Sequence, residues 1–149
     1  MSQPSLFGGS SGRSAVAHID GGSRGNPGPA AYGVHIARAD GAIVELKEYI
    51  GVATNNVAEY RGLVSALSWA RTLGIDRLHV RSDSQLLIKQ MRGEYRVKHA
   101  GLIPLWQEAR VLARQIGDVQ FEHVRREFNK DADRLANEAM DEAAASNIT

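Results

Sequence analysis

Four carboxylates stand where the local sequence pattern changes, and they are the residues best suited to chemistry. Asp20 follows a short apolar run and precedes a glycine-rich turn, and Asp83 follows a second such run. Glu59 and Asp133 each lie near the start of a segment with helical periodicity. Because the chain has no cysteine, a metal would have oxygen or imidazole ligands. Converging carboxylates repel one another, and bound Mg²⁺ or Mn²⁺ relieves this repulsion, so the pattern favours a divalent-cation site.

Each carboxylate also has a purely structural interpretation. Glu59 lies three residues after Asn56, which is the spacing of a capping box at a helix start. Asp133 can stabilise a helix dipole, and Asp131 competes with it for either role. Asp20 can satisfy the amides of the turn that follows it. Four acids at element boundaries make cation binding the more economical interpretation.

Polar residues near these acids suit a phosphodiester substrate. Two divalent ions about 4 Å apart can hold the attacking water and the leaving oxygen of such a substrate. Thr54, Asn55 and Asn56 stand at an expected helix start, where free backbone amides and the dipole favour a phosphate. Asn26, Asn56 and Gln85 carry amides that can meet base edges or ribose hydroxyls in a shallow groove.

Hydrophobic periodicity and turn residues predict the elements that must position these groups. Strands are expected over 15–20, 30–38, 42–52, 76–82 and 118–124. Helices are expected between Asn56 and Gly74, over 83–92, over 102–116, and from Lys130 to about Ala144. Three strands in succession form an antiparallel meander, and the later strand-helix-strand crossover adds parallel strands. The expected fold class is α/β, with a five-stranded mixed sheet and helices on both faces.

This topology predicts where the acids meet. Ligands of such sheets bind beyond the carboxyl ends of the parallel strands. Asp20 ends the first expected strand and Asp83 ends the fourth, so both share one edge if these strands are parallel neighbours. Glu59, in the first turn of a helix that leaves this edge, can then face Asp20.

Length and composition limit the class of protein. The 149 residues fit one domain, expected over 15–144, with tails over 1–14 and 145–149. No apolar run is long enough for a membrane span and no secretory signal is apparent, so a cytoplasmic location is expected. The net charge is only +1, so any surface for nucleic acid must be a local basic cluster. The candidate clusters are Arg92 with Arg96 and Lys98, and Arg125 with Arg126 and Lys130, although a solvated face is the commoner explanation for such a cluster taken alone.

Four motifs in order give the chain a resemblance to a known family. They are Asp20-Gly-Gly-Ser-Arg-Gly-Asn-Pro-Gly, Thr54-Asn-Asn-Val-Ala-Glu59, Ser82-Asp83-Ser-Gln85 and Asn129-Lys-Asp-Ala-Asp133-Arg-Leu-Ala-Asn137. Over residues 15 to about 142 the chain resembles type 1 ribonuclease H, which cuts the RNA strand of RNA–DNA hybrids. The resemblance implies a ribonuclease H-like fold and hydrolysis with two Mg²⁺ ions, for which Mn²⁺ substitutes, leaving 3′-hydroxyl and 5′-phosphate ends.

The resemblance also assigns roles by position. The metal-binding carboxylates of the family match Asp20, Glu59, Asp83 and Asp133. Its phosphate pocket matches Thr54 and Asn55, and its minor-groove contacts match Asn26, Asn56 and Gln85. The implied partner is an RNA–DNA hybrid, with double-stranded RNA as a further candidate substrate. No dimerisation stripe is left over once the helices cover the sheet, so a monomer is expected.

Two segments depart from the pattern of the longer family members. Many carry a basic, Trp-containing protrusion after the second helix, for which the segment 93–101 is too short, so hybrid binding would depend on Arg96 and Lys98. Many also place a histidine in the loop before the last helix, and here that loop is shortened. His123 is expected in a structural role at a strand end, so Arg126 is the candidate substitute and Arg125 the second. Both departures occur in a shorter subgroup of bacterial and archaeal members, which the chain resembles more closely.

Two other functions are compatible with the same residues. A module that binds hybrids or double-stranded RNA without cutting would be favoured by a missing acid, and none of the four is missing. Polynucleotidyl transferases and resolvases use the same fold and acids on other substrates. The amides of Asn56 and Gln85 favour the ribonuclease, because reading 2′-hydroxyls is what separates RNA from DNA.

Overall fold

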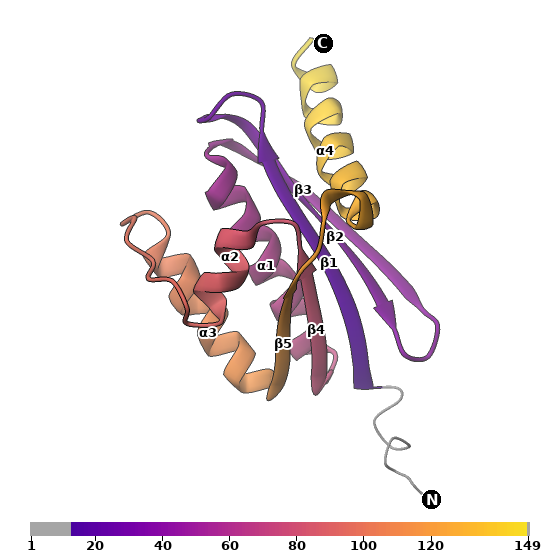
Figure 1. Ribbon diagram of the computed structural model, residues 1–149. Helices are drawn as coiled ribbons and strands as arrows, with labels where there is room; N and C mark the ends of the chain where they lie inside the picture. Colours follow the sequence, from indigo (N-terminus) through magenta and orange to yellow (C-terminus); the bar gives the residue numbers. More distant parts are fainter. Residues whose placement is uncertain (1–12, 149) are drawn as a thin grey trace, which may run out of the picture.

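The computed structural model describes residues 13–148, which form one mixed sheet with helices on both of its faces (Figure 1). The strands are β1 (Ser14–Ser23), β2 (Gly28–Arg38), β3 (Ile43–Ala53), β4 (Arg77–Ser82) and β5 (Asp118–His123). The helices are α1 (Asn55–Thr72), α2 (Gln85–Met91), α3 (Ile103–Ile116) and α4 (Lys130–Ile148), with a short 3₁₀ helix, η2, over Arg126–Phe128.

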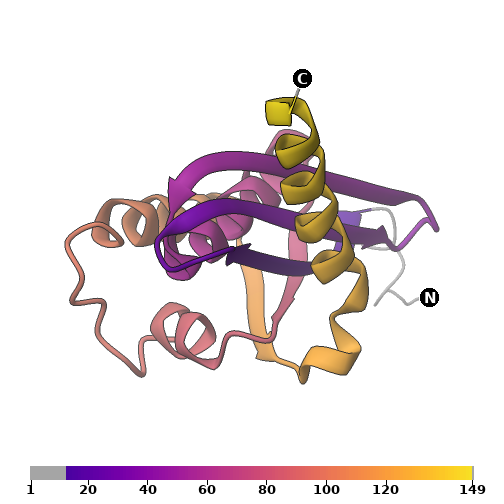
Figure 2. The ribbon, with the colours of Figure 1, turned by 90° about the horizontal axis from the view of Figure 1, so that it is seen from above.

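The strand order is β3-β2-β1-β4-β5. β1, β2 and β3 form the expected antiparallel meander, whereas β4 runs parallel to β1 and to β5. The first three helices lie on one side of the sheet, and α4 packs on β1, β2 and β3 from the other side (Figures 1 and 2). The predicted fold class is therefore confirmed, including the parallel neighbours on which the placement of Asp20 and Asp83 depends.

The alternation of side chains along the strands divides the core into two parts. On β1, the buried residues Ala15, Ala17 and Ile19 face α1 and belong to the larger cluster, to which α1 contributes Tyr60 and Leu63. A smaller cluster lies beneath α4. Five residues on one face of this helix are buried: Ala132, Leu135, Ala136, Ala139 and Met140.

The first strand does not end at Asp20 as the turn residues suggest. Gly21, Gly22 and Ser23 stay paired with β2, although the parallel pairing with β4 stops at Ile19. Glycine and serine are poor strand formers, but here the ladder of the neighbouring strand satisfies their backbone groups. Asp20 thus lies inside β1 and just beyond the end of the parallel pair.

The start of α1 also differs from one of the interpretations above. Thr54 is the N-cap, and its hydroxyl accepts a hydrogen bond from the backbone N–H of Val57 at 3.3 Å. The capping box between Asn56 and Glu59 is therefore wrong, because both residues lie inside the helix, and the carboxylate of Glu59 is left for another role.

The ends of the domain lie slightly outside the predicted bounds. The expected N-terminal tail falls mostly on residues 1–12, outside the described residues, but Ser14 already belongs to β1. The last helix passes the predicted end near Ala144 and continues to Ile148, through most of the expected C-terminal tail. Among the described helices, none combines the length and the apolar character that crossing a membrane requires.

Gly21 sets how closely α1 approaches the sheet. A Cβ atom at this position would lie 2.4 Å from the backbone nitrogen of Glu59 and 2.4 Å from the carbonyl carbon of Ala58. No real side chain tolerates that distance, so only glycine lets the first turns of α1 rest on β1. The contact brings Glu59 next to the strand residue that follows Asp20.

We expect Gly21→Ala to destabilise the protein by roughly 1–3 kcal/mol, because the methyl group would force α1 away from β1. The free energy of unfolding, measured by urea titration, checks this. Gly22→Ala is the matched control, since its Cβ would meet only the Cε of Met140, at 3.9 Å. The control should change stability by less than about 0.5 kcal/mol. Equal losses in both variants would contradict the steric explanation.

Candidate active site

Three carboxylates converge at the edge of the sheet where the parallel strands end. The pairing of β1 with β4 stops at Ile19 and Ser82, so Asp20 and Asp83 are the next residues on adjacent strands. Glu59 reaches the same point from the second turn of α1. One carboxylate oxygen from each of these three acids lies within 4.8 Å of the others. The predicted meeting point is therefore confirmed.

Asp133 completes the group from the opposite face of the sheet. It lies in the first turn of α4, and its side chain shares a hydrogen bond with Asp20. The four predicted acids also line one pocket of about 340 Å³. They come from β1, α1, α4 and the residue after β4, so the site exists only when the whole domain is folded.

Burial and mutual repulsion strongly perturb these groups. Burial, followed by the nearby charges of Asp83, Asp133 and Glu59, raises the pKa of Asp20 to about 8. Burial raises the pKa of Glu59 to about 7, although a hydrogen bond with Ser84 opposes the increase. Burial also raises the pKa of Asp83, against the attraction of Arg126. The site is therefore short of positive charge near neutral pH.

The chemistry of the donor set fits hard divalent cations. Mg²⁺ and Mn²⁺ prefer carboxylate oxygens, and an ion between these acids would supply the positive charge that burial makes necessary. Asp20, Glu59 and Asp83 would hold such an ion, since their oxygens lie closest together. Asp133, which is tied to Asp20, would complete the ligands of an ion on the α4 side.

The loop before α4 places one arginine at the acids. Arg126 lines their pocket, and its Nε lies 3.9 Å from Oδ2 of Asp83, while 88% of its side chain is exposed. Arg125 instead faces Glu127 and lies over the ring of Phe128. His123 is the last residue of β5, as predicted, but it is exposed, so burial gives no support to a structural role. This geometry favours Arg126 over Arg125.

The predicted phosphate-binding residues form a hydrogen-bonded corner at the start of α1. Oδ1 of Asn26 accepts a hydrogen bond from the backbone N–H of Asn55 at 3.1 Å. Oδ1 of Asn55 in turn accepts from both the backbone N–H and the hydroxyl of Ser23, each at 2.8 Å. With Thr54 capping the helix, these bonds fix the glycine-rich loop against α1. Of these residues, Asn55 and Ser23 line the pocket of the acids.

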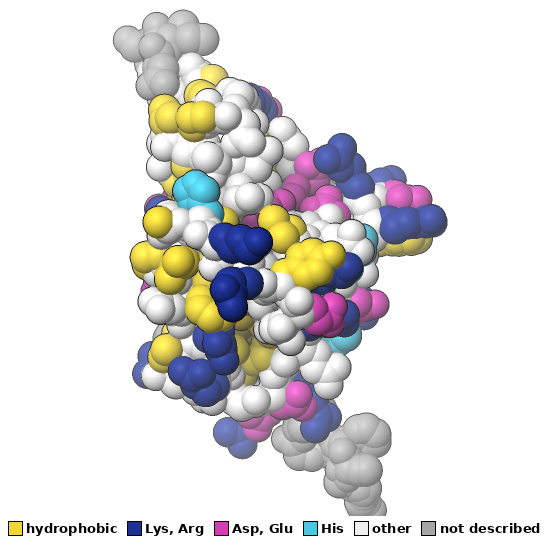
Figure 3. All heavy atoms as spheres, turned by 60° about the vertical axis from the view of Figure 1, so that its left-hand side comes forward, with side chains coloured by type: hydrophobic (Ala, Val, Ile, Leu, Met, Phe, Trp, Pro, Cys, Tyr) yellow, Lys and Arg dark blue, Asp and Glu magenta, His cyan; other side chains and the backbone are white. Residues whose placement is uncertain are grey.

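Asn56 and Gln85 lie outside the acid pocket. Asn56 lines a neighbouring groove of about 550 Å³, together with Tyr95, Arg96 and Lys98. Gln85 is the exposed first residue of α2. Figure 3 shows Lys and Arg side chains next to hydrophobic ones on the side of the molecule that carries α2 and α3. The structure thus places the side chain of Asn56 on a second, basic and aromatic surface.

Two asparagines support the site in ways that the sequence did not reveal. Asn129 is only 1% exposed, and its Nδ2 donates to the carbonyl oxygen of Ile19 at 2.8 Å, which ties the start of α4 to the residue before Asp20. Nδ2 of Asn137 donates to the backbone oxygen of Asp133 at 3.0 Å and lies 3.3 Å from its Oδ1. The contact of Asn137 could have been predicted, because side chains four residues apart on a helix are neighbours. The role of Asn129 could not, because its partner Ile19 is distant in the sequence and approaches it only in the folded protein.

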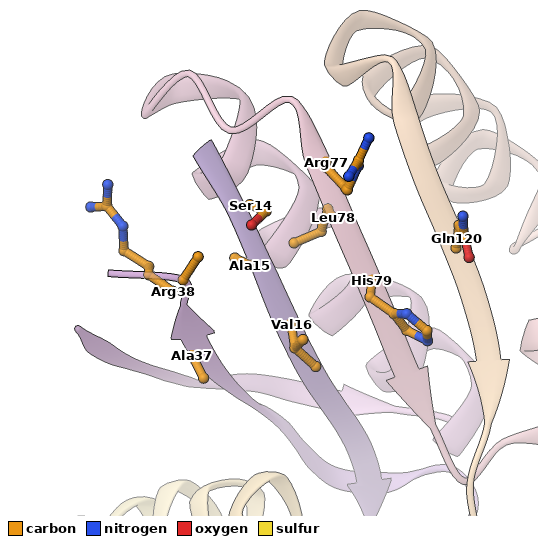
Figure 4. A pocket seen from close by; sticks show the side chains of 10 residues that line it. Ser14, Ala15, Val16, Ala37, Arg38, Arg77, Leu78, His79 and Gln120 are labelled. Carbon is orange, nitrogen blue, oxygen red and sulfur yellow. The ribbon is translucent and has the colours of Figure 1, made fainter. Parts of the chain in front are cut away.

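A larger hollow lies elsewhere on the sheet and has a different character. It measures about 540 Å³ and lies near the starting ends of β1 and β4, away from the acids (Figure 4). Val16, Arg77, His79 and Gln120 are among its lining residues, which include no carboxylate. Chemistry, and not size, therefore identifies the acid pocket as the candidate active site.

Comparisons with known proteins agree with this geometry. Residues 18–139 match the family model described as reverse transcriptase-like. The bifunctional protein Rv2228c of Mycobacterium tuberculosis is 51% identical over 133 residues, which cover 88% of this chain but 36% of that protein. Ribonuclease HI of Halobacterium salinarum is 46% identical over 85% of this chain and 64% of its own length. The chain thus spans less than two thirds of these curated relatives.

Solved structures match almost over their full length. The N-terminal RNase H domain of Rv2228c has a TM-score of 0.85 at 49% identity, with 90% of this chain and 98% of that chain covered. RNase H1 of Halobacterium salinarum has a TM-score of 0.82 at 45% identity, with 87% of this chain and 98% of that chain covered. LC11-RNase H1, solved in complex with an RNA/DNA hybrid, has a TM-score of 0.82 at 39% identity, with 87% of this chain and 99% of that chain covered. On this combined sequence and structural similarity, the chain belongs to the type 1 ribonuclease H family.

Proposed function

We propose that the protein is an endonuclease that hydrolyses the RNA strand of RNA–DNA hybrids and leaves 3′-hydroxyl and 5′-phosphate ends. The observation that carries the proposal is the convergence of Asp20, Glu59 and Asp83 within 4.8 Å of one another, with Asp133 bonded to Asp20. Relatives named ribonuclease HI and a relative solved with an RNA/DNA hybrid support the substrate class. A cytoplasmic location, a monomeric state and activity on double-stranded RNA remain expectations.

Two Mg²⁺ ions are the proposed cofactors, with Mn²⁺ as a substitute. When bound, the ions activate a water molecule and stabilise the leaving oxygen of the phosphodiester. The four acids would hold them, and the partial burial of these acids reduces the screening of their charges by water. The fixed hydrogen bonds of Asn129 and Asn137 keep Asp133 aligned with Asp20 before substrate arrives.

The hydrogen-bonded corner at the start of α1 is the proposed phosphate site. The helix dipole, the hydroxyl of Thr54 and the side-chain Nδ2 of Asn55 favour an anion beside the acids. Because Asn26 and Asn55 are already held by hydrogen bonds, little side-chain entropy is lost when a phosphate binds. Asn56 and Gln85 are the proposed contacts to the minor groove of the hybrid.

The groove beside Asn56 is the proposed surface for the rest of the hybrid. Tyr95 is half exposed and has Nζ of Lys89 4.8 Å from its ring centroid, while Arg96 and Lys98 add positive charge. Such a mixture of aromatic and basic side chains suits stacking and phosphate contacts. In the described chain, the segment 92–102 contains no helix, which agrees with the proposed place in the shorter subgroup without a basic protrusion.

We expect Asp83→Asn to lower Mg²⁺-dependent cleavage of an end-labelled RNA–DNA duplex by about 100-fold or more, since it removes a central ligand charge. Hybrid affinity should change little, because most of the binding surface lies elsewhere. Matched RNA–RNA and DNA–DNA duplexes, with Mg²⁺, Mn²⁺ or chelator, test the substrate class. Normal cleavage by the variant would refute the metal assignment, and binding without cutting by the wild type under every metal would favour a non-catalytic module.

Arg126→Ala should lower the cleavage rate by roughly tenfold, because an exposed guanidinium beside Asp83 can stabilise charge on the phosphate without being a metal ligand. Arg125→Ala is the matched control, with an effect of less than about twofold, since Arg125 faces Glu127. Single-turnover rates on the hybrid measure both. A larger loss in Arg125→Ala than in Arg126→Ala would reverse the assignment.

In the metal-free protein, Asp20→Asn should increase stability at high pH. The pKa of Asp20 is raised to about 8 in the folded state, above its value in the unfolded chain. The folded protein therefore binds the extra proton, and the wild type loses stability as the pH rises from about 4 to 8. We expect a gain of roughly 2–4 kcal/mol at pH 8 that vanishes toward pH 4. Urea unfolding with chelator measures it, and a gain independent of pH would contradict the electrostatic cause.

A further inference from the structure

A second group of possible metal ligands lies on the α4 face of the sheet, apart from the four acids. His18 on β1 and His35 on β2 are directly opposite each other in the antiparallel pair. Both line a pocket of about 190 Å³, together with Asn129 and Asp131. Glu45, on β3, is the register partner of His35. Two neighbouring strands and the start of α4 thus contribute side chains to this pocket, which Lys130 also lines, and Glu45 lies beside it on β3.

The two ring nitrogens of His35 face different carboxylates, and the spacing at Nε2 suits a metal ion. Nδ1 of His35 lies 3.2 Å from Oε2 of Glu45, and its Nε2 lies 3.9 Å from Oδ2 of Asp131. The second distance is too long for a hydrogen bond. Metal bonds of about 2.0–2.2 Å to nitrogen and oxygen can span it. One possible ligand atom from each of His35, Glu45 and Asp131 lies within 4.8 Å of the others.

Arg134 organises the two carboxylates without filling the gap. Its Nη2 contacts Oδ1 of Asp131 at 3.6 Å and also bonds Oε2 of Glu45. Oδ2 of Asp131 is the oxygen that faces the imidazole of His35. The arginine therefore holds the carboxylates in place from one side and leaves one oxygen directed at the histidine.

An independent observation points to a ligand in this pocket. Asn129 forms part of its wall and is 1% exposed, yet its Oδ1 has no hydrogen-bond partner within the part of the chain that the structure describes. Its Nδ2 is occupied by the carbonyl oxygen of Ile19, which fixes the orientation of the amide. A buried acceptor without a partner is costly, and a cation or its bound water would satisfy it.

We propose that this pocket is a second, non-catalytic metal site, selective for a divalent transition metal such as Zn²⁺, with Nε2 of His35 and a carboxylate oxygen of Asp131 as ligands and His18 beside them. Glu45 would orient the imidazole of His35 through Nδ1. Imidazole suits Zn²⁺, whereas Mg²⁺ prefers oxygen ligands, so the two sites differ in metal preference. The bound ion would link β2 to the first turn of α4. That turn carries Asp133, two residues after Asp131.

Zinc binding is best measured in an Asp83→Asn background, which weakens binding at the catalytic acids. Titration against a chromophoric chelator, with excess Mg²⁺ present, should show one zinc site per chain. Adding His35→Gln should weaken its affinity by at least about tenfold. His79→Gln is the matched control, because His79 is also a strand histidine, 2.8 Å from Glu122 on the neighbouring strand, but contacts no second carboxylate among residues 13–148. This control should leave zinc affinity unchanged.

Two further measurements separate a lost ligand from a damaged fold. Asp131→Asn changes an exposed residue and should weaken zinc binding in the same background, even if His35→Gln is poorly folded. Long-range proton–nitrogen NMR spectra of the Asp83→Asn protein should show zinc shifting the imidazole signals of His18 and His35 and not those of His79 and His99. Unchanged zinc affinity in both ligand variants, or equal weakening by His79→Gln, would overturn the proposal.

Discussion

The repulsion between buried carboxylates at the end of β1 and β4 is the constraint on which the rest of the structure depends. Burial and neighbouring charge raise the pKa of Asp20 to about 8 and that of Glu59 to about 7. The folded protein therefore disfavours the ionised form of both acids. A free chain would separate them. Packing of the sheet against α1 and α4 therefore supplies the free energy that keeps the acids together, and a bound cation recovers part of it.

The contacts that hold the acids are made by backbone and amide groups with little freedom to move. Gly21 lets α1 lie directly on β1, and the amide of Asn129 ties the start of α4 to Ile19. Both contacts flank Asp20 within one residue along β1. The precision of the site thus comes from close backbone approach on both faces of one strand, and only secondarily from the acids themselves.

The sequence predicted those features that depend on local pattern. The alternating strands, the helical stripes and the change from meander to crossover gave the sheet, and the parallel pair then placed Asp20 beside Asp83. It failed where tertiary pairing overrides local preference. Gly21 to Ser23 read as a turn but extend β1, because β2 supplies their partners. Likewise, the cap at Thr54 and the tether at Asn129 depend on geometry that residue types alone do not specify.

The two groups of possible ligands show how one sheet can separate two metal chemistries. Along β1, side chains alternate between the faces, so His18 and Asp20 point to the same side, two residues apart. The α4 residues Asp131 and Asp133 repeat this spacing, and each faces a different member of the strand pair. The site at the end of the parallel strands, around Asp20, offers oxygen ligands. The site two residues earlier along β1, around His18, adds imidazole ligands. Ligand type, and not distance, then decides which ion each position accepts.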